Sequence, residues 1–231
     1  MENVFNEGSM FLARWLHFLA GVVWIGTLYY FNFMQGAFMA EVDAATKSNI
    51  LTKMLPRAMW WFRWGAKVTF LTGLFIILAK GHQAGHGIYL TAWGTTILVG
   101  ALLGTVMYLN VWCVIWPAPK VVIKSATQVA GGGQALPEAP QKAAKALLAS
   151  RTNTMFSIPM LFFMGAASHY PFPVAEGQLG IFWAIIGLIV LGLEANALKG
   201  KLGPLTTVKG VISCGFTLTA IIYAISQIFS A

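Results

Sequence analysis

Long apolar runs occupy most of the chain, and short polar segments separate them. A helix needs roughly 20 consecutive apolar residues to cross a bilayer core of about 30 Å. Runs of about this length lie at 10–36, 57–79, 88–116, 153–169, 178–198 and 208–229. The pattern therefore predicts an all-α integral membrane protein, a bundle of six transmembrane helices.

The composition agrees with this prediction. Apolar residues make up 58% of the 231 residues and charged residues only 10%, which excludes an ordinary soluble globular protein. Cys113 and Cys214 both fall in apolar runs, and no Cys-x-x-Cys-His motif is present. The sequence therefore excludes covalently attached c-type haem and gives no support for a disulfide framework.

The net charge of +8 follows from the predicted topology and does not indicate a nucleic-acid partner. With six spans, the connections alternate between the two sides of the membrane. Of the 15 Lys and Arg residues, only Arg14 and Lys80 lie on the side that holds both termini. The positive-inside rule then places both termini outside the cytoplasm. We expect a multi-pass protein of the bacterial inner membrane with periplasmic termini, and the lipid bilayer as its first partner.

Only one connection is long, the predicted cytoplasmic loop 117–151. Its centre, VAGGGQALPEAP, has the Gly and Pro content of a flexible linker. The next segment, QKAAKALLASR, is rich in helix formers and carries Lys142 and Lys145, which favours a short helix on the cytoplasmic membrane surface. No repeat of 20–50 residues is visible. Residues 1–231 are therefore predicted to form a single transmembrane helical domain.

All four histidines fall on the predicted outer side. His17 lies about seven residues inside the first span, or roughly 10 Å at a rise of 1.5 Å per residue, and His169 closes the fourth span. Each has a glycine one turn deeper on the same helix face, Gly21 or Gly165, which leaves room for a flat macrocycle. Helical bundles build haem sites from axial ligands on facing helices. The spacing therefore predicts that His17 and His169 bind the iron of haem b.

Simpler interpretations of the histidines stay open. An isolated histidine in a membrane helix also serves as a hydrogen-bond donor to a neighbouring carbonyl, and small-x-x-x motifs also serve helix packing. His82 and His86 are spaced four residues apart, as in a helical metal site, but the glycines around them favour a solvated loop. Of these two, His86 is the better candidate ligand.

A second layer of polar residues is predicted nearer the cytoplasmic side. It comprises Asn32, Gln35, Arg63, Lys67, Asn110, Asn153, Ser157, Glu194 and Asn196. An ionisable group inside a membrane costs a few kcal/mol unless it is paired. Arg63 therefore needs Glu194, a haem propionate or a bound anion as its partner, or it reaches the cytoplasmic headgroups past the neighbouring tryptophans. If this layer is catalytic, Arg63 holds an anionic substrate, and Asn32 and Asn110 orient it.

Four motifs resemble one known family. RWLHFLAGVVWIGTLYYFNF, WWFRWGA, LNVWCVIWP and SIPMLFFMGAASHYP are similar, in this order, to the motifs of the bacterial cytochrome-c-linked urate oxidases, in their urate oxidase N-terminal domain. The resemblance covers roughly residues 10–170. The first motif also resembles other small bacterial haem-b membrane proteins. The resemblance implies oxidation of urate or a related small molecule by a membrane-bound oxidoreductase.

In that family a C-terminal c-type cytochrome follows the membrane part, and residues 1–231 lack it. The resemblance therefore implies either a separate electron acceptor, such as a periplasmic c-type cytochrome or a larger respiratory complex, or a different task on the same scaffold. Two other functions stay open: transport or binding of a metal ion or small molecule, and an accessory subunit of a membrane complex. Glycines in the last two spans suit close packing, which leaves a homo-oligomer open.

Overall fold

The computed structural model describes residues 2–230, with side chains from residue 7 onward. Every regular element in this range is helical. The longer helices are α1 (Glu2–Tyr29), α4 (Leu55–Ala84), α5 (Ala92–Leu109), α6 (Pro117–Ala130), α7 (Ala139–His169), α8 (Leu179–Lys199) and α9 (Val208–Ile228). Short helices and turns join them: η1 (Tyr30–Gln35), α2 (Gly36–Glu41), α3 (Ala44–Asn49), η2 (Ile50–Met54), η3 (His86–Leu90), η4 (Asn110–Ile115), η5 (Glu176–Gln178) and η6 (Gly203–Thr206).

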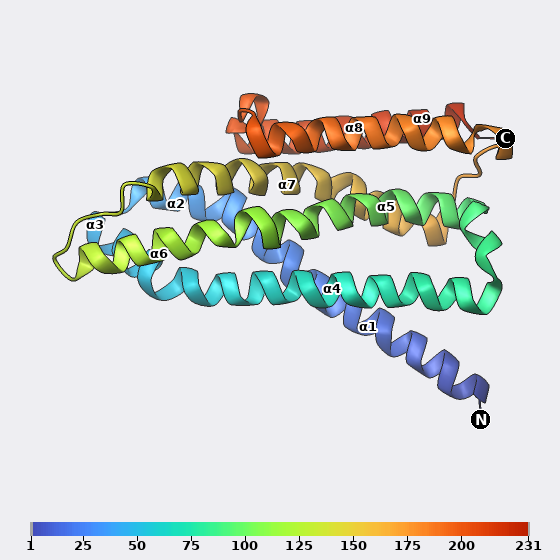
Figure 1. The fold of residues 1–231 in the computed structure, drawn as a ribbon, viewed down its shortest axis with the longest axis horizontal. Helices are drawn as coiled ribbons and strands as arrows, with labels where there is room; N and C mark the ends of the chain where they lie inside the picture. The colour runs from blue at the N-terminus through green and yellow to red at the C-terminus, as the bar shows by residue number, and fades with distance from the viewer. Residues whose placement is uncertain (1, 231) are drawn as a thin grey trace.

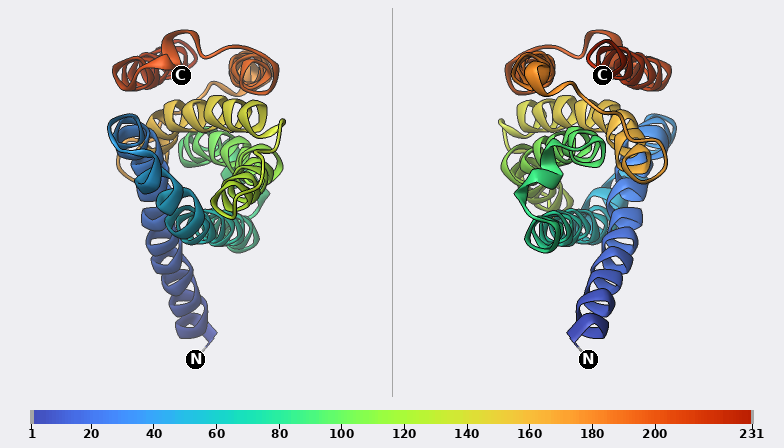
Figure 2. Two further views of the ribbon diagram at one scale, coloured as in Figure 1. Left: turned by 90° about the vertical axis from the view of Figure 1, so that its left-hand side faces the viewer. Right: turned by 90° about the vertical axis from the view of Figure 1, so that its right-hand side faces the viewer.

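The long helices run side by side along the longest axis of the molecule (Figure 1). α1 packs mainly on α4, and α5 packs mainly on α7. α8 and α9 lie beyond α7 on one side of the bundle, and the N-terminal part of α1 projects away from it (Figure 2). The start of α1, the α4–η3 connection and the end of α7 lie at the same end of the bundle (Figure 1). All four histidines are therefore at that end, as the sequence predicts.

Five stretches in the described residues are long and apolar enough to cross a membrane: Glu7–Glu41, Ala44–Ala84, Ala92–Ala130, Glu176–Lys199 and Val208–Ile228. They confirm the all-helical class. The fourth predicted span, 153–169, lies in α7 and is not among them. α7 packs against α5, α6 and α9 and buries polar residues such as Asn153 and Ser157. A helix that protein surrounds on several sides can carry these residues, which lowers its hydropathy.

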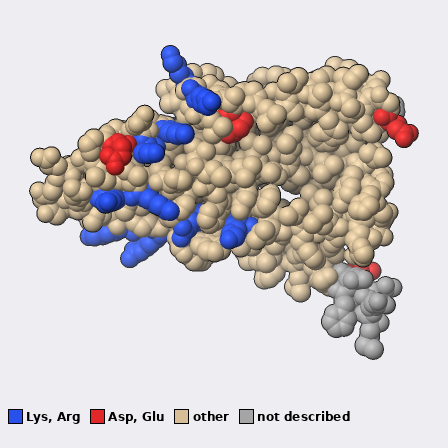
Figure 3. All heavy atoms as spheres, viewed as in Figure 1, with Lys and Arg blue, Asp and Glu red and all other residues tan. Residues whose placement is uncertain are grey.

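The segment 117–151 is more helical than the sequence predicts. α6 occupies its first part, and α7 begins at Ala139 and continues without a break to His169. The predicted surface helix is therefore the first part of α7 and makes no turn before the fourth span. On the face shown in Figure 3, Lys and Arg side chains gather toward the end of the molecule where α6 ends and α7 begins (Figure 1). This agrees with the predicted charge asymmetry.

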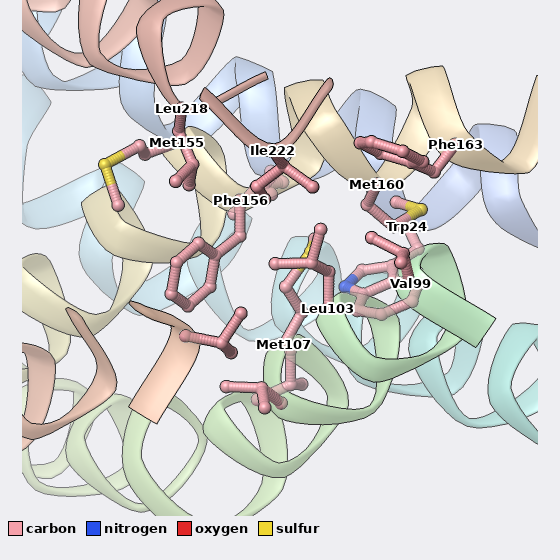
Figure 4. Close-up of a cluster of buried hydrophobic side chains, with 14 of the residues drawn as sticks. Trp24, Val99, Leu103, Met107, Met155, Phe156, Met160, Phe163, Leu218 and Ile222 are labelled. Carbon is pink, nitrogen blue, oxygen red and sulfur yellow. The ribbon is translucent and has the colours of Figure 1, made fainter. Parts of the chain in front are cut away.

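The hydrophobic core includes side chains of α1, α4, α5, α7, α8 and α9, and Figure 4 shows the part where α1, α5, α7 and α9 meet. Fully or almost fully buried side chains fill it, among them Trp24, Leu103, Phe156, Phe163 and Ile222. Because lipid tails are as apolar as these side chains, close van der Waals packing between the helices, and not removal of apolar surface from water, stabilises this core.

The extended segment after α7 is fixed to the start of α5. The backbone N–H of Phe172 donates to Thr96 Oγ1 at 2.8 Å, and Thr95 Oγ1 donates to the Phe172 carbonyl at 2.9 Å. Both threonines and Phe172 are buried. These bonds hold the C-terminal end of α7 beside the start of α5.

We expect Thr96→Val to destabilise the protein by about 1–3 kcal/mol, because the buried N–H of Phe172 loses its acceptor without a change in side-chain volume. Thermal unfolding in detergent, followed by circular dichroism, measures the effect. Thr105→Val is the control, because the Thr105 hydroxyl bonds only to the carbonyl of Ala101 in its own helix. An equal loss of stability in both variants would show that the Phe172 anchor contributes nothing.

Candidate functional site

A cavity of about 1000 Å³ lies between the α1–α4 pair and the α5–α7 pair. Its lining is mostly apolar and includes four glycines, Gly21 and Gly26 from α1, Gly73 from α4 and Gly104 from α5. α8 contributes Trp183. His17 is its one titratable lining residue among those that the structure describes. The cavity is therefore an apolar chamber with a single imidazole in its wall.

The imidazole of His17 is bound to α4 through one nitrogen. Nδ1 lies 2.9 Å from the carbonyl oxygen of Thr69 and 3.2 Å from Thr72 Oγ1. A carbonyl oxygen only accepts, so Nδ1 carries the hydrogen and Nε2 carries the lone pair. Among the described residues, Nε2 has no hydrogen-bond partner. This is the arrangement of a metal-binding histidine, in which the other ring nitrogen donates to a backbone carbonyl.

A glycine of the neighbouring helix makes room for this imidazole. A Cβ atom at Gly73 of α4 would lie 2.9 Å from His17 Cε1 and 3.3 Å from Nδ1. Real Cβ atoms do not approach another atom so closely, so position 73 accepts only glycine while His17 keeps this rotamer. Gly21 lines the cavity, but a Cβ there would meet only Thr69 Cγ2, at 3.9 Å. The sequence could not indicate Gly73, because it lies on α4, and residue spacing along α1 relates His17 only to residues of its own helix.

Two methionines of α7 line the wall made by α5 and α7. Met160 is buried in the core beside Trp24 (Figure 4). Met164 is half-buried, and a Cβ at Gly100 of α5 would lie 3.2 Å from its Cγ. Trp24 also lines the cavity, and its Nε1 is buried without a hydrogen-bond partner among the described residues.

The structure does not bring His169 to this cavity. His169 is exposed at the end of α7 and is not a lining residue. Gly165 is exposed too, and a Cβ there would meet nothing within 4 Å. Of the predicted ligand pair, only His17 reaches the chamber, and the predicted role of His169 gains no support from its position.

The other two outer histidines are exposed. His82 lies in the last turn of α4, so the predicted loop is wrong at this residue, because the helix continues to Ala84. Gly85, at φ +81°, then ends it. His86 begins η3, and its ring centroid lies 6.3 Å from that of Tyr89. Neither histidine lines the cavity.

Three of the inner polar residues form one hydrogen-bonded cluster. Asn110 Nδ2 donates to Asn153 Oδ1 at 2.9 Å and to Glu194 Oε2 at 2.8 Å. Asn153 Nδ2 in turn donates to the Met107 carbonyl at 2.9 Å. The cluster joins α5 and η4 to α7 and α8. Asn110 begins the π-helical turn η4, a type of distortion that is frequent at functional sites.

Asn32 has different partners. Its Nδ2 donates to the Leu28 carbonyl at 2.9 Å and to Ser150 Oγ at 2.8 Å. It lies in the π-helical turn η1 and, with Gln35, lines a second cavity of about 200 Å³. Gln35 Oε1 is buried there without a hydrogen-bond partner among the described residues.

Arg63 does not pair with Glu194. Its guanidinium carbon lies 3.9 Å from the centroid of a Trp116 ring, a cation–π contact, while Glu194 accepts from Asn110. α4 and α8, which carry Arg63 and Glu194, lie on opposite sides of the bundle in both Figures 1 and 2. Among the described residues, no hydrogen bond or ion pair joins Arg63, Asn32 and Asn110. The structure therefore gives these three predicted substrate residues separate surroundings.

A comparison with protein families gives one result. Residues 85–195 match the model of the urate oxidase N-terminal family. This is the family that the motifs resemble, and the match covers the region from η3 to α8. It includes Met164, His169 and the cluster of Asn110, and it does not reach His17 on α1. Searches of curated proteins and of solved structures gave no match.

Among the described residues, no group of three or more His, Cys, Asp or Glu side chains is placed to hold a metal ion. Two features of the described residues are candidate functional sites: the apolar chamber with His17 and the polar cluster of Asn110. The first lies between two helix pairs, and the second links the family-matched helices α5, α7 and α8.

Proposed function

We propose that this protein is a membrane-embedded redox protein that holds a b-type haem at His17 and passes electrons to a partner on the outer side. One observation carries the proposal: the His17 Nδ1–H bond to the Thr69 carbonyl, which leaves the Nε2 lone pair in the wall of a cavity of about 1000 Å³. A haem at this position supplies one-electron chemistry. The chain supplies the ligand, its orientation and an apolar pocket.

The chamber fits a haem in three respects. Its volume is at the upper end of the roughly 300–1,000 Å³ range of ligand pockets, as a large flat macrocycle requires. Its walls are mostly apolar, which suits the porphyrin faces. Arg14 lies one turn from His17 toward the outer end of α1 and is exposed, so a propionate at the outer edge has a cationic partner on the same helix.

The proposed topology uses α7 as a sixth span beside the five apolar stretches. Protein contacts around α7 compensate for its polar residues, and the gathering of Lys and Arg toward one end supports a cytoplasmic location for that end (Figure 3). Both termini then lie outside, in the periplasm of a bacterial inner membrane. The histidine end, with the haem, faces the same side, where a soluble c-type cytochrome or a respiratory complex accepts the electrons.

The family match supports urate or a related small molecule as the electron donor. The separate surroundings of Arg63, Asn32 and Asn110 favour the smaller cluster of Asn110, Asn153 and Glu194 as the polar site of the matched helices. Asn110 Nδ2 uses both of its hydrogens within the cluster, so the half-buried Glu194 carboxyl is the group left to accept from a planar heterocycle. This assignment uses residues inside the family match, whereas Arg63 and Asn32 lie before it.

A second candidate function is the binding or transport of an apolar small molecule. Exposed side chains of α1, Phe18 and Val22, belong to the lining, so the chamber opens toward the surface that faces lipid. A lipophilic molecule that enters from the bilayer would use His17 Nε2 as a hydrogen-bond acceptor. This function requires no haem, so the haem content of the purified protein distinguishes it from the redox function.

Extraction and electron transfer test the first function together. Acidified acetone should release a non-covalent b-type haem from the purified protein, and the dithionite-reduced protein should reduce ferric cytochrome c in a stopped-flow experiment. The reduction should be lost in protein from which the haem has been extracted and should return after haemin is added. A purified protein that carries an apolar ligand and no haem would support the second function instead.

A further inference from the structure

We propose that the thioether of Met164 is the second axial ligand of the haem at His17. The inference rests on the proposed haem site and names a residue that the spacing of the histidines did not indicate. His17 stands on the wall that α1 and α4 form. Met164 stands on the wall that α5 and α7 form, across the same chamber. One ligand from each helix pair is the arrangement that an axially bound macrocycle between the pairs requires.

A glycine of the adjacent helix lies against each of the two residues. His17 lies against Gly73 of the adjacent helix α4, and Met164 lies against Gly100 of the adjacent helix α5. A Cβ at Gly100 would lie 3.2 Å from both Cγ and the backbone nitrogen of Met164. Each glycine thus lets a candidate ligand lie close to the neighbouring backbone. This places the imidazole and the Met164 Cγ beside the neighbouring helices, at the walls of the chamber.

Met164 is a better candidate than Met160, which lies one turn away on the same helix. Met160 is only 6% exposed and belongs to the core, beside Trp24 (Figure 4). Met164 is half-buried and only borders the core. Its flexible side chain has the freedom to turn its sulfur toward an iron atom.

His169 is the competing ligand, and its position is less suitable. It lies on the same helix as Met164, five residues farther toward the outer end, and its side chain is exposed outside the chamber. To reach an iron bound at His17, the imidazole would have to enter a chamber that the α7 side chains Met160, Leu161 and Met164 already line. A Met ligand also raises the reduction potential relative to bis-histidine ligation. That suits a haem that receives electrons from an organic substrate.

Near-infrared magnetic circular dichroism of the ferric wild-type protein tests the inference, because its charge-transfer band distinguishes thioether from bis-imidazole ligation. We expect the thioether band. Met164→Leu should abolish this band and convert the ferric haem from low spin to high spin. Met164→His should restore a low-spin haem with a bis-imidazole band and a lower midpoint potential. Met160→Leu is the matched control and should keep the thioether band.

A bis-imidazole band in the wild-type protein would overturn the inference, above all if His169→Ala abolishes it and Met164→Leu does not. That result would leave the proposed haem function intact. A wild-type protein without haem would refute the proposed function and this inference together. The wild-type spectrum decides between the ligands even if a variant fails to fold.

Discussion

His17→Ala should lower the affinity of the protein for haem by at least about 100-fold. Loss of a partner that only orients a metal ligand already costs 10–100-fold, and this variant removes the ligand itself. The chamber would keep its apolar walls, so free imidazole should enter it and restore part of the binding. Haemin titration of protein purified without haem, followed by absorbance with and without imidazole, measures both effects.

His82→Ala is the matched control for this prediction. His82 belongs to the same outer set of histidines, but its side chain is exposed at the end of α4 and does not line the chamber. Its replacement should leave haem affinity unchanged. Equal affinities of the wild-type protein and His17→Ala would show that the haem, if bound, is held elsewhere.

Gly73→Leu should lower haem affinity by about 10–100-fold, although residue 73 carries no ligand atom. The new Cβ would lie 2.9 Å from His17 Cε1, so the imidazole would have to move. That movement breaks the 2.9 Å bond from Nδ1 to the Thr69 carbonyl, which fixes the tautomer. Leucine is a strong helix former, so the helix itself should not suffer. The same titration measures the change, and circular dichroism checks that the fold is intact.

Gly165→Ala separates the two glycine hypotheses. The sequence spacing pairs Gly165 with His169, whereas in the structure a Cβ at residue 165 meets nothing within 4 Å. We expect wild-type haem affinity in Gly165→Ala. A loss at Gly165 together with no loss at Gly73 would favour the spacing hypothesis and contradict the structure-based one.

The helical class and most of the helices could be predicted from the sequence, because long apolar runs have few alternatives in a membrane. The exception is informative. α7 carries Asn153 and Ser157, so by apolarity it is the weakest of the six predicted spans. The structure buries both side chains against neighbouring helices, where Asn153 Nδ2 donates to the Met107 carbonyl and Ser157 Oγ lies 2.8 Å from the Tyr29 hydroxyl. Hydropathy measures how well a residue suits lipid, and it does not include hydrogen bonds that a neighbouring helix provides.

The candidate site could be predicted only in part, for a related reason. His17 was visible as a costly polar group in an apolar helix. The residues that contact His17 from the neighbouring helix could not be predicted. The spacing of residues along one helix shows which of them share a face and gives no information about the helix opposite. Thr69, Gly73 and Gly100 all act across a helix interface. Asn110 and Glu194 appeared in the sequence as separate polar residues, and only the packing of η4 and α8 joins them.

The most direct test of haem binding at His17 is a reduced-minus-oxidised absorbance spectrum of the purified wild-type protein, recorded beside that of His17→Ala at equal protein concentration. We expect a b-type difference spectrum in the wild-type protein and its loss in the variant. A wild-type protein with no difference spectrum, or a variant with an unchanged one, would contradict the assignment of His17 as a haem ligand.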